Sequence, residues 1–321
     1  EAGHFLAAKR LGIAVEEFAV GFGPVVWAWR RGETRYSLRL LPLGGFVRLA
    51  GESGETAEIP FERTYYGQPA WTRLVLALSG PLANVVLAVA LVVGAILGFG
   101  LPRPRVAGLV PGRPAAEVFE VGDVILAING RSAWATEDVG AAIRAVAPEP
   151  VTFGIRRGGQ ELDVSVAPVF SEEEGRYLVG AYFSLLYERP PIGEGVVLSF
   201  KWIGGAMAGF VAAIRGLITR DIPAEEVIGP VGIATLLGQR VMDGPLIFFL
   251  LVALISLNLA LVNLIPFPAL DGARMAFALY EVVTRRKVSP RVETAVHAAG
   301  FVVLLGLMIL IAFQDLRRLF G

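Results

Sequence analysis

The chain has 321 residues, of which 55% are hydrophobic and 18% charged, whereas about 25% of the residues of a soluble domain are charged; this composition favours a membrane protein. The 29 basic and 29 acidic side chains cancel, which argues against a nucleic-acid partner. Because the chain has no cysteine, disulfides and thiolate metal sites are excluded, and a metal would need imidazole, carboxylate or carbonyl ligands.

The first residues, Glu1-Ala2-Gly3-His4, read as an H-E-x-x-H motif without its leading histidine. On a helix this motif directs two imidazoles at one metal, and its glutamate can act as general base. We expect residues 1–12 to form the end of a first, truncated transmembrane helix, with a further histidine just before Glu1. Taken alone, however, a histidine on an apolar helix is more often a hydrogen-bonded core residue.

Residues 13–70 predict a β-hairpin followed by a cytoplasmic loop. Tyr36, Leu38 and Leu40 alternate with polar side chains, and the apolar run 25–29 precedes a turn at 30–33, which is a hairpin pattern. Because the hairpin is so apolar, we expect it to dip into the membrane or to lie against the helices. Open-edged backbone at that depth is tolerated only where protein or a water-filled cavity satisfies it.

Three uncharged runs are long enough to cross a bilayer, for which about 20 apolar residues suffice. They predict a second transmembrane helix over 71–102, a third over 244–284 and a fourth within 285–321. The arginine-rich segments before the second helix and after the third should face the cytoplasm. The segment between these two helices should then lie on the outer side.

Residues 103–170 have the character of a soluble α+β domain, with short β-rich runs around one helical stretch and a strand that ends at Asn129-Gly130. The following segment, 171–243, predicts a linker and a membrane-associated stretch. Its apolar part, 199–217, fits either an amphipathic helix on the membrane surface or a packed segment.

Asp271 ends the long apolar run of the third predicted helix. An ionisable group at membrane depth is by default functional, and a metal dication would compensate its charge. Asp-Gly after a proline-rich turn is also a helix-capping context. In a polytopic chain, His4 and Asp271 together favour a metal site, whereas His297 fits no motif and is interpreted as structural.

Several motifs resemble the site-2 protease family of intramembrane zinc metalloproteases, specifically its bacterial regulator-of-sigma-E protease (RseP) branch. The matching segments keep the family's order over nearly the whole chain: Glu1-Ala2-Gly3-His4, Gly21-Phe22-Gly23-Pro24, Pro42-Leu43-Gly44-Gly45-Phe46-Val47, Ser79-Gly80-Pro81-Leu82-Ala83-Asn84, Gly229-Pro230-Val231-Gly232-Ile233, and Asn263-Leu264-Ile265-Pro266-Phe267-Pro268-Ala269-Leu270-Asp271-Gly272. The segment 122–130 resembles part of a PDZ domain.

The resemblance implies a polytopic α-helical membrane protein of about four transmembrane helices, with a membrane-associated β-hairpin and an inserted α+β PDZ-like domain. It implies His4 and Asp271 as Zn²⁺ ligands, Glu1 as general base, and Asn84 and Asn263 as residues that hold the substrate backbone. Both asparagines could instead only shape helix ends. A substrate unwound from its helix would add to the strand of Tyr36, Leu38 and Leu40.

The expected function is site-2 cleavage of single-span membrane proteins, such as anti-sigma factors or remnant signal peptides. We expect a multi-pass protein of the bacterial inner membrane that contacts lipid, with its active site toward the cytoplasm and the PDZ-like domain outside. That domain would bind peptides or exclude large substrates. The alternatives are an inactive membrane PDZ scaffold and a transporter, for which the breaks at Gly80-Pro81 and Pro266 give mild support.

Overall fold

The computed structural model describes residues 1–52, 59–134, 136–172, 174–221, 223, 229–240 and 244–320. The chain divides into two compact units, one of residues Glu1–Val92 with Ser199–Gly321 and one of Val93–Leu198. Because residues 53–58, 173, 222, 224–228 and 241–243 are not among those described, parts of the predicted segments 13–70 and 171–243 lie outside the description.

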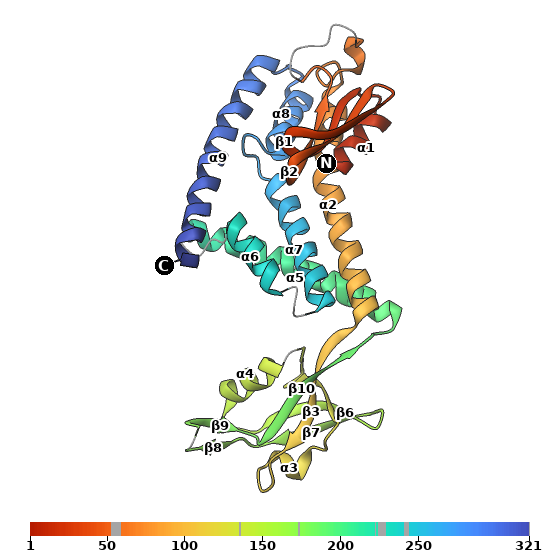
Figure 1. Ribbon diagram of the computed structural model, residues 1–321. Helices are drawn as coiled ribbons and strands as arrows, with labels where there is room; N and C mark the ends of the chain where they lie inside the picture. Colours follow the sequence, from red (N-terminus) through yellow and green to blue (C-terminus); the bar gives the residue numbers. More distant parts are fainter. Residues whose placement is uncertain are drawn as a thin grey trace. The chain divides into compact units, whose positions relative to one another are not determined.

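The first unit contains the hairpin and most of the helices (Figure 1). Its elements are α1 (Ala2–Arg10), β1 (Val15–Arg31), β2 (Thr34–Leu49), η1 (Phe61–Arg63), most of α2 (Ala70–Phe99), most of α5 (Ile192–Thr219), α6 (Pro230–Arg240), α7 (Pro245–Asn263), α8 (Asp271–Thr284) and α9 (Pro290–Phe320).

Four helices in the described part of the chain are long and apolar enough to cross a membrane: Ala70–Phe99, Ile192–Thr219, Pro245–Asn263 and Pro290–Arg318. Three of them match predicted transmembrane helices. The fourth, α5, is the stretch that the sequence left open between a surface helix and a packed segment. The nine-residue α1 is too short to span, so the four candidate helices do not include the truncated first helix.

The predicted third transmembrane helix, 244–284, is interrupted. It ends as α7 at Asn263, and a new helix, α8, begins at Asp271. Pro266 and Pro268 lie between the two helices, and proline lacks the amide that an uninterrupted helix needs. The break places Asp271 in the first turn of a helix instead of in the middle of one.

Buried charges join the helices of the first unit. Arg73 of α2 donates a hydrogen bond to Glu281 of α8, and its guanidinium lies 3.8 Å from the carboxylate of Glu293 of α9. Asp315 of α9 accepts hydrogen bonds from the backbone N–H groups of Gly229 and Gly232 at 3.1 and 2.9 Å. These contacts explain why the motif at 229–233 begins a helix: a carboxylate from another element satisfies its free amides.

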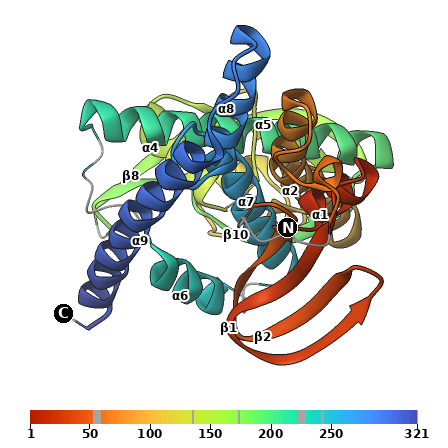
Figure 2. The ribbon, with the colours of Figure 1, turned by 90° about the horizontal axis from the view of Figure 1, so that it is seen from above.

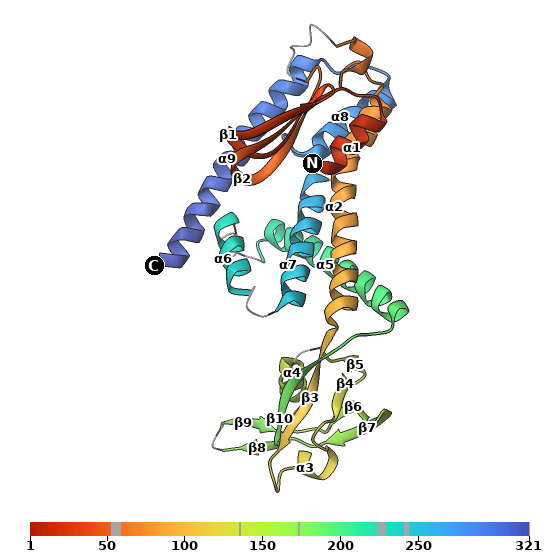
Figure 3. The same ribbon diagram turned by 45° about the vertical axis from the view of Figure 1, so that its right-hand side comes forward.

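Helices α2 and α7 lie side by side, and the Ser256 hydroxyl donates to the Asn84 carbonyl at 2.9 Å (Figures 1 and 3). Proline at position 81 lies inside α2 without ending it. The part of α2 around Asn84 therefore lies close to α7.

The hairpin is longer and more folded than predicted, because β1 and β2 curve back on themselves (Figure 2). Residues 25–31 pair with 34–39, as the sequence predicts, but residues 17–20 pair both with 35–38 and with 45–48. Strand 35–38 is therefore flanked on both sides, and the segments 25–31 and 45–49 form the edges. Val26, Trp27 and Leu40 are 62%, 58% and 61% exposed, which is a surface suited to lipid.

The second unit is an α+β domain. It contains the ends of α2 and α5 with β3 (Leu101–Leu109), α3 (Ala115–Val118), β4 (Val124–Ile128), β5 (Arg131–Ser132), α4 (Thr136–Val146), β6 (Val151–Arg157), β7 (Gln160–Val166), β8 (Val169–Ser171), β9 (Arg176–Leu178) and β10 (Ala181–Glu188). Its main sheet has the order β10-β3-β4-β6-β7, with β5 paired to β4.

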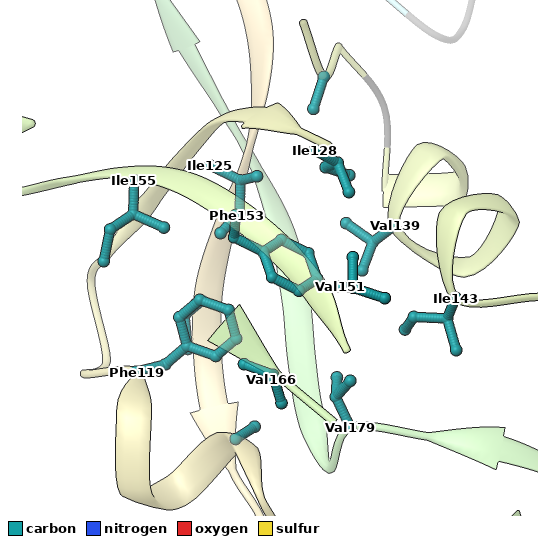
Figure 4. Packing of buried hydrophobic residues seen from close by; sticks show 13 residues of the cluster. Phe119, Ile125, Ile128, Val139, Ile143, Val151, Phe153, Ile155, Val166 and Val179 are labelled. Carbon is teal, nitrogen blue, oxygen red and sulfur yellow. The ribbon is translucent and has the colours of Figure 1, made fainter. Parts of the chain in front are cut away.

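The domain ends later than predicted. The sequence placed its end at residue 170, but β10 pairs antiparallel with β3 along its whole length, from Ala181↔Leu109 to Glu188↔Leu101. Closing the sheet thus requires a strand that the sequence assigned to the linker. The core is closed by α3 and α4, and Phe153 packs edge-on against Phe119 at 5.2 Å between ring centroids (Figure 4).

Candidate active site

One pocket of about 290 Å³ in the first unit gathers five of the predicted site residues. Its lining includes Glu1, His4, Asn84, Asn263 and Asp271. These come from the start of α1, the middle of α2, the end of α7 and the start of α8. The tertiary structure therefore brings together residues from opposite ends of the chain.

His4 and Asp271 face each other directly. The His4 Nε2 atom lies 3.2 Å from Asp271 Oδ2, and both side chains are largely buried, with 17% and 18% exposed. The other ring nitrogen, Nδ1, donates to the Leu76 carbonyl at 3.0 Å. Because this hydrogen bond uses the Nδ1 proton, Nε2 is the ring nitrogen that faces the carboxylate.

Close approach of two helices holds His4 in place. A Cβ on Gly3 would lie 2.4 Å from the Ser79 carbonyl oxygen, so α1 and α2 touch backbone to backbone there. A Cβ on Gly80 would lie 2.0 Å from His4 Nε2. The two glycines leave the imidazole the space it occupies beside α2.

Asp271 is held by the turn that precedes α8. In this turn Ala269 has a left-handed backbone, with φ of 78°, and its N–H donates to His297 Nδ1 at 3.1 Å. No side chain caps the N-terminus of α8 through a hydrogen bond, and the Asp271 carboxylate turns to His4 instead. Asp271 therefore lies at the start of a helix, as the capping context predicts, but its side chain does not cap that helix. His297 contacts the turn and lies outside the His4–Asp271 pair.

The hairpin contributes a different strand to the pocket than predicted. Phe46, Val47 and Leu49 line it, whereas Tyr36, Leu38 and Leu40 do not appear in its lining. Tyr36 stacks on Trp29, with 4.9 Å between ring centroids. The prediction that the strand 36–40 offers a free edge was wrong, because residues 35–38 already pair on both sides.

The edge that faces the pocket is 45–49, which pairs with β1 on one side only within the described residues. The sequence pattern could not identify this edge, because alternation marks a strand and says nothing about its neighbours.

Two lining residues were missed in the sequence. Arg274 lies one helical turn after Asp271 and shares its face of α8, so its spacing could have marked it. Tyr65 lines the same pocket and lies under the guanidinium of Arg274, 5.5 Å from the ring centroid. Burial raises the pKa of the Tyr65 hydroxyl, which keeps this group neutral and able to donate a hydrogen bond.

The His4–Asp271 pair fits a bound Zn²⁺. Two ligand atoms on one tetrahedral zinc are about 3.3–3.4 Å apart, close to the 3.2 Å between Nε2 and Oδ2. Without its proton Nε2 can bind a metal through its lone pair, and an Nδ1–H bonded to a carbonyl is the usual support of a zinc-bound histidine. Among the described residues no three His, Asp or Glu side chains group as metal ligands, and His4 and Asp271 are the two candidate ligands that face each other in the pocket.

The chain is similar to metalloproteases along its length. It is 30% identical to the zinc metalloprotease RasP of Geobacillus kaustophilus (100% of this chain, 94% of that protein), 27% to the regulator of sigma-W protease RasP of Bacillus subtilis (100% and 95%) and 28% to the metalloprotease MmpA of Caulobacter vibrioides (99% and 92%).

A solved PDZ domain of an SdrC-like protein from Listeria monocytogenes aligns with 25% of this chain and 85% of that domain, at 18% identity and a TM-score of 0.24. The family model of peptidase family M50 matches residues 1–307, in agreement with the resemblance to the site-2 proteases. The chain therefore belongs to peptidase family M50 and is a metalloprotease.

Proposed function

We propose that this protein is an intramembrane zinc endopeptidase in which His4 and Asp271 hold the metal and Glu1 acts as general base. The observation that carries the proposal is the His4–Asp271 pair, 3.2 Å apart, with Nδ1 committed to the Leu76 carbonyl. Glu1 lines the same pocket, where its carboxylate can take a proton from the attacking water and pass it to the leaving amine. Zinc bound at this site supplies a Lewis acid for the peptide carbonyl and acidifies water.

The pocket also has the groups needed to hold a substrate backbone. Asn84 and Asn263 line it together, and each amide carries both a donor and an acceptor. The edge 45–49 offers unpaired main-chain groups to an extended peptide by β-addition. A transmembrane segment must unwind first, because the carbonyls of a helix are already bonded. Asn84 and Asn263 then bind main-chain groups close to the metal ligands.

The substrates we propose are single-span membrane proteins of the anti-sigma-factor or signal-peptide type. The RasP relative named regulator of sigma-W protease and the four apolar helices support this class. The arginine-rich segments support a bacterial inner-membrane protein with the metal site toward the cytoplasm and the PDZ-like domain on the outer side. The exposed apolar side chains of the hairpin then contact lipid.

The test is zinc content and cleavage, measured on protein produced with a histidine immediately before Glu1, which completes the H-E-x-x-H motif. We expect one zinc per chain and cleavage of a single-span peptide. Glu1→Gln should keep the zinc and lower the cleavage rate by about 10²–10⁴-fold. An inactive scaffold or a transporter would hold no stoichiometric zinc, and that result would contradict the proposal.

A further inference from the structure

One ion pair connects the pocket-facing edge of the hairpin to the helix that carries Asp271. Glu52 follows the end of β2 by three residues and accepts a hydrogen bond from Arg274 of α8 through Oε1. Its second oxygen, Oε2, accepts the backbone N–H of Leu49 at 3.5 Å. A single carboxylate therefore contacts both the last residue of the edge strand and the zinc-ligand helix.

Arg274 is placed to fix the position of the edge strand relative to α8. It lies three residues after Asp271, so the two side chains project from the same face of α8, and it lines the pocket beside the metal ligands. The side chains of Arg274 and Glu52 are 32% and 22% exposed. A charge-assisted hydrogen bond in such partial burial is stronger and better oriented than one on an open surface.

We propose that Glu52 and Arg274 are positioning residues that fix the register between the edge strand 45–49 and the metal ligand Asp271. The inference rests on the proposed function, because it assumes that a substrate adds to this edge and is cut at the His4–Asp271 site. The Glu52–Arg274 pair then determines which peptide bond of the bound strand reaches the metal. It touches neither the metal nor the scissile bond.

The physical reason lies in the geometry of an added strand. A peptide that slips by one residue moves by about 3.3 Å, and a misplacement of about 1 Å in the reacting group can cost on the order of 10²-fold in rate. Within the described residues the edge strand, which is the end of β2, pairs on one side only, with β1. The Glu52 contact is a second attachment, at the end of the strand and toward α8.

The experiment compares Glu52→Gln, Arg274→Gln and the double variant, in the full chain with a histidine before Glu1. A synthetic single-span peptide of defined sequence is the probe, and the cut sites are mapped by mass spectrometry. Each single variant should lower kcat by about 10–100-fold and spread the cut over neighbouring bonds, with zinc content unchanged. The double variant should be no worse than the worse single variant, because the two residues act as one unit.

Two further variants separate a positioning role from general loss of structure. Glu52→Asp keeps the charge and should recover a single main cut site, with at least a fivefold higher kcat than Glu52→Gln. Glu174→Gln, which removes a carboxylate from the exposed Arg176–Glu174 pair of the other unit, should cut as the unchanged protein does.

The inference is overturned if Glu52→Gln cuts the same single bond with kcat within twofold of the unchanged protein, if the effects of the two single variants multiply in the double variant, or if Glu52→Gln loses zinc. Failure of the unchanged protein to bind zinc or to cut the peptide would instead contradict the proposed function. The two failures are therefore distinguishable.

Discussion

The Nε2 atom of His4 lies 3.2 Å from the Oδ2 atom of Asp271, although 267 positions separate the two residues. This distance is the central relationship of the molecule. It joins α1 to α8 across α2, whose Leu76 carbonyl fixes the tautomer of the histidine. Neighbouring backbone holds both side chains in place, α2 beside His4 and the turn at Ala269 before Asp271.

Replacing Asp271 by asparagine should remove zinc. The amide is a weaker, uncharged ligand, so we expect the zinc affinity to fall more than tenfold and cleavage to be lost. Metal content by mass spectrometry and a competition assay with a chelator would measure this. Asp163→Asn, an exposed carboxylate of β7, is the matched control. Equal zinc affinity in the two variants would exclude Asp271 as a ligand.

Gly80→Ala should also weaken the metal site, through sterics alone. The added Cβ would lie 2.0 Å from His4 Nε2, so the imidazole must move, while a Cβ on Gly94 of the same helix meets nothing within 4 Å. We expect Gly80→Ala to lower zinc affinity by at least tenfold. Gly94→Ala should leave it unchanged, because alanine only improves helix propensity there, by up to about 1 kcal/mol. Similar affinities for both variants would contradict this account of how His4 is held.

Proline on the edge strand should impair substrate binding. Successive residues of a strand direct their N–H groups alternately to the partner and away from it, so one of Phe46→Pro and Val47→Pro removes an amide that faces outward. That variant should raise KM or lower kcat/KM at least tenfold with full zinc content. Val26→Pro on the opposite edge should stay within about threefold. If all three variants cut alike, no substrate adds to the edge 45–49.

The second unit should lose stability in acid through Asp123. This carboxylate is buried and accepts two hydrogen bonds from Arg157, at 2.9 and 2.6 Å. Burial by itself raises the pKa of Asp123, but the hydrogen bonds from Arg157 and from the Glu120 backbone N–H outweigh it and hold the pKa below its ordinary value. The stabilisation is thus complete above the unfolded pKa of about 3.9 and is lost as pH falls through the lower folded pKa.

Hydrogen exchange of the amides of β4 in the full chain, corrected for the intrinsic rate at each pH, would measure this loss. Asp123→Asn should lower the free energy of unfolding of this unit by about 2–3 kcal/mol at neutral pH. It should also flatten the dependence of this free energy on pH below the unfolded pKa of about 3.9. An Asp123→Asn variant with unchanged acid dependence would show that other groups cause it.

The sequence by itself determined the class of protein and most of its elements. The uncharged runs at 74–99 and 294–314 predict membrane helices, and the alternation at 34–40 predicts a strand. The proline break before Asp271 and the E-x-x-H spacing were likewise local signals. These signals identified His4 and Asp271 as candidate metal ligands, because a charge or an imidazole in such apolar surroundings needs a partner.

Only the tertiary structure decided which groups meet. It placed Phe46 and Val47, and not Tyr36 and Leu38, in the pocket of His4 and Asp271, because strand order depends on pairing between distant segments. It assigned β10 to the domain of β3 for the same reason. It also brought Arg274 and Glu52 together across 222 positions. Local pattern encodes period and polarity, whereas such contacts arise from how whole elements pack, and that information is not present in any one stretch of the chain.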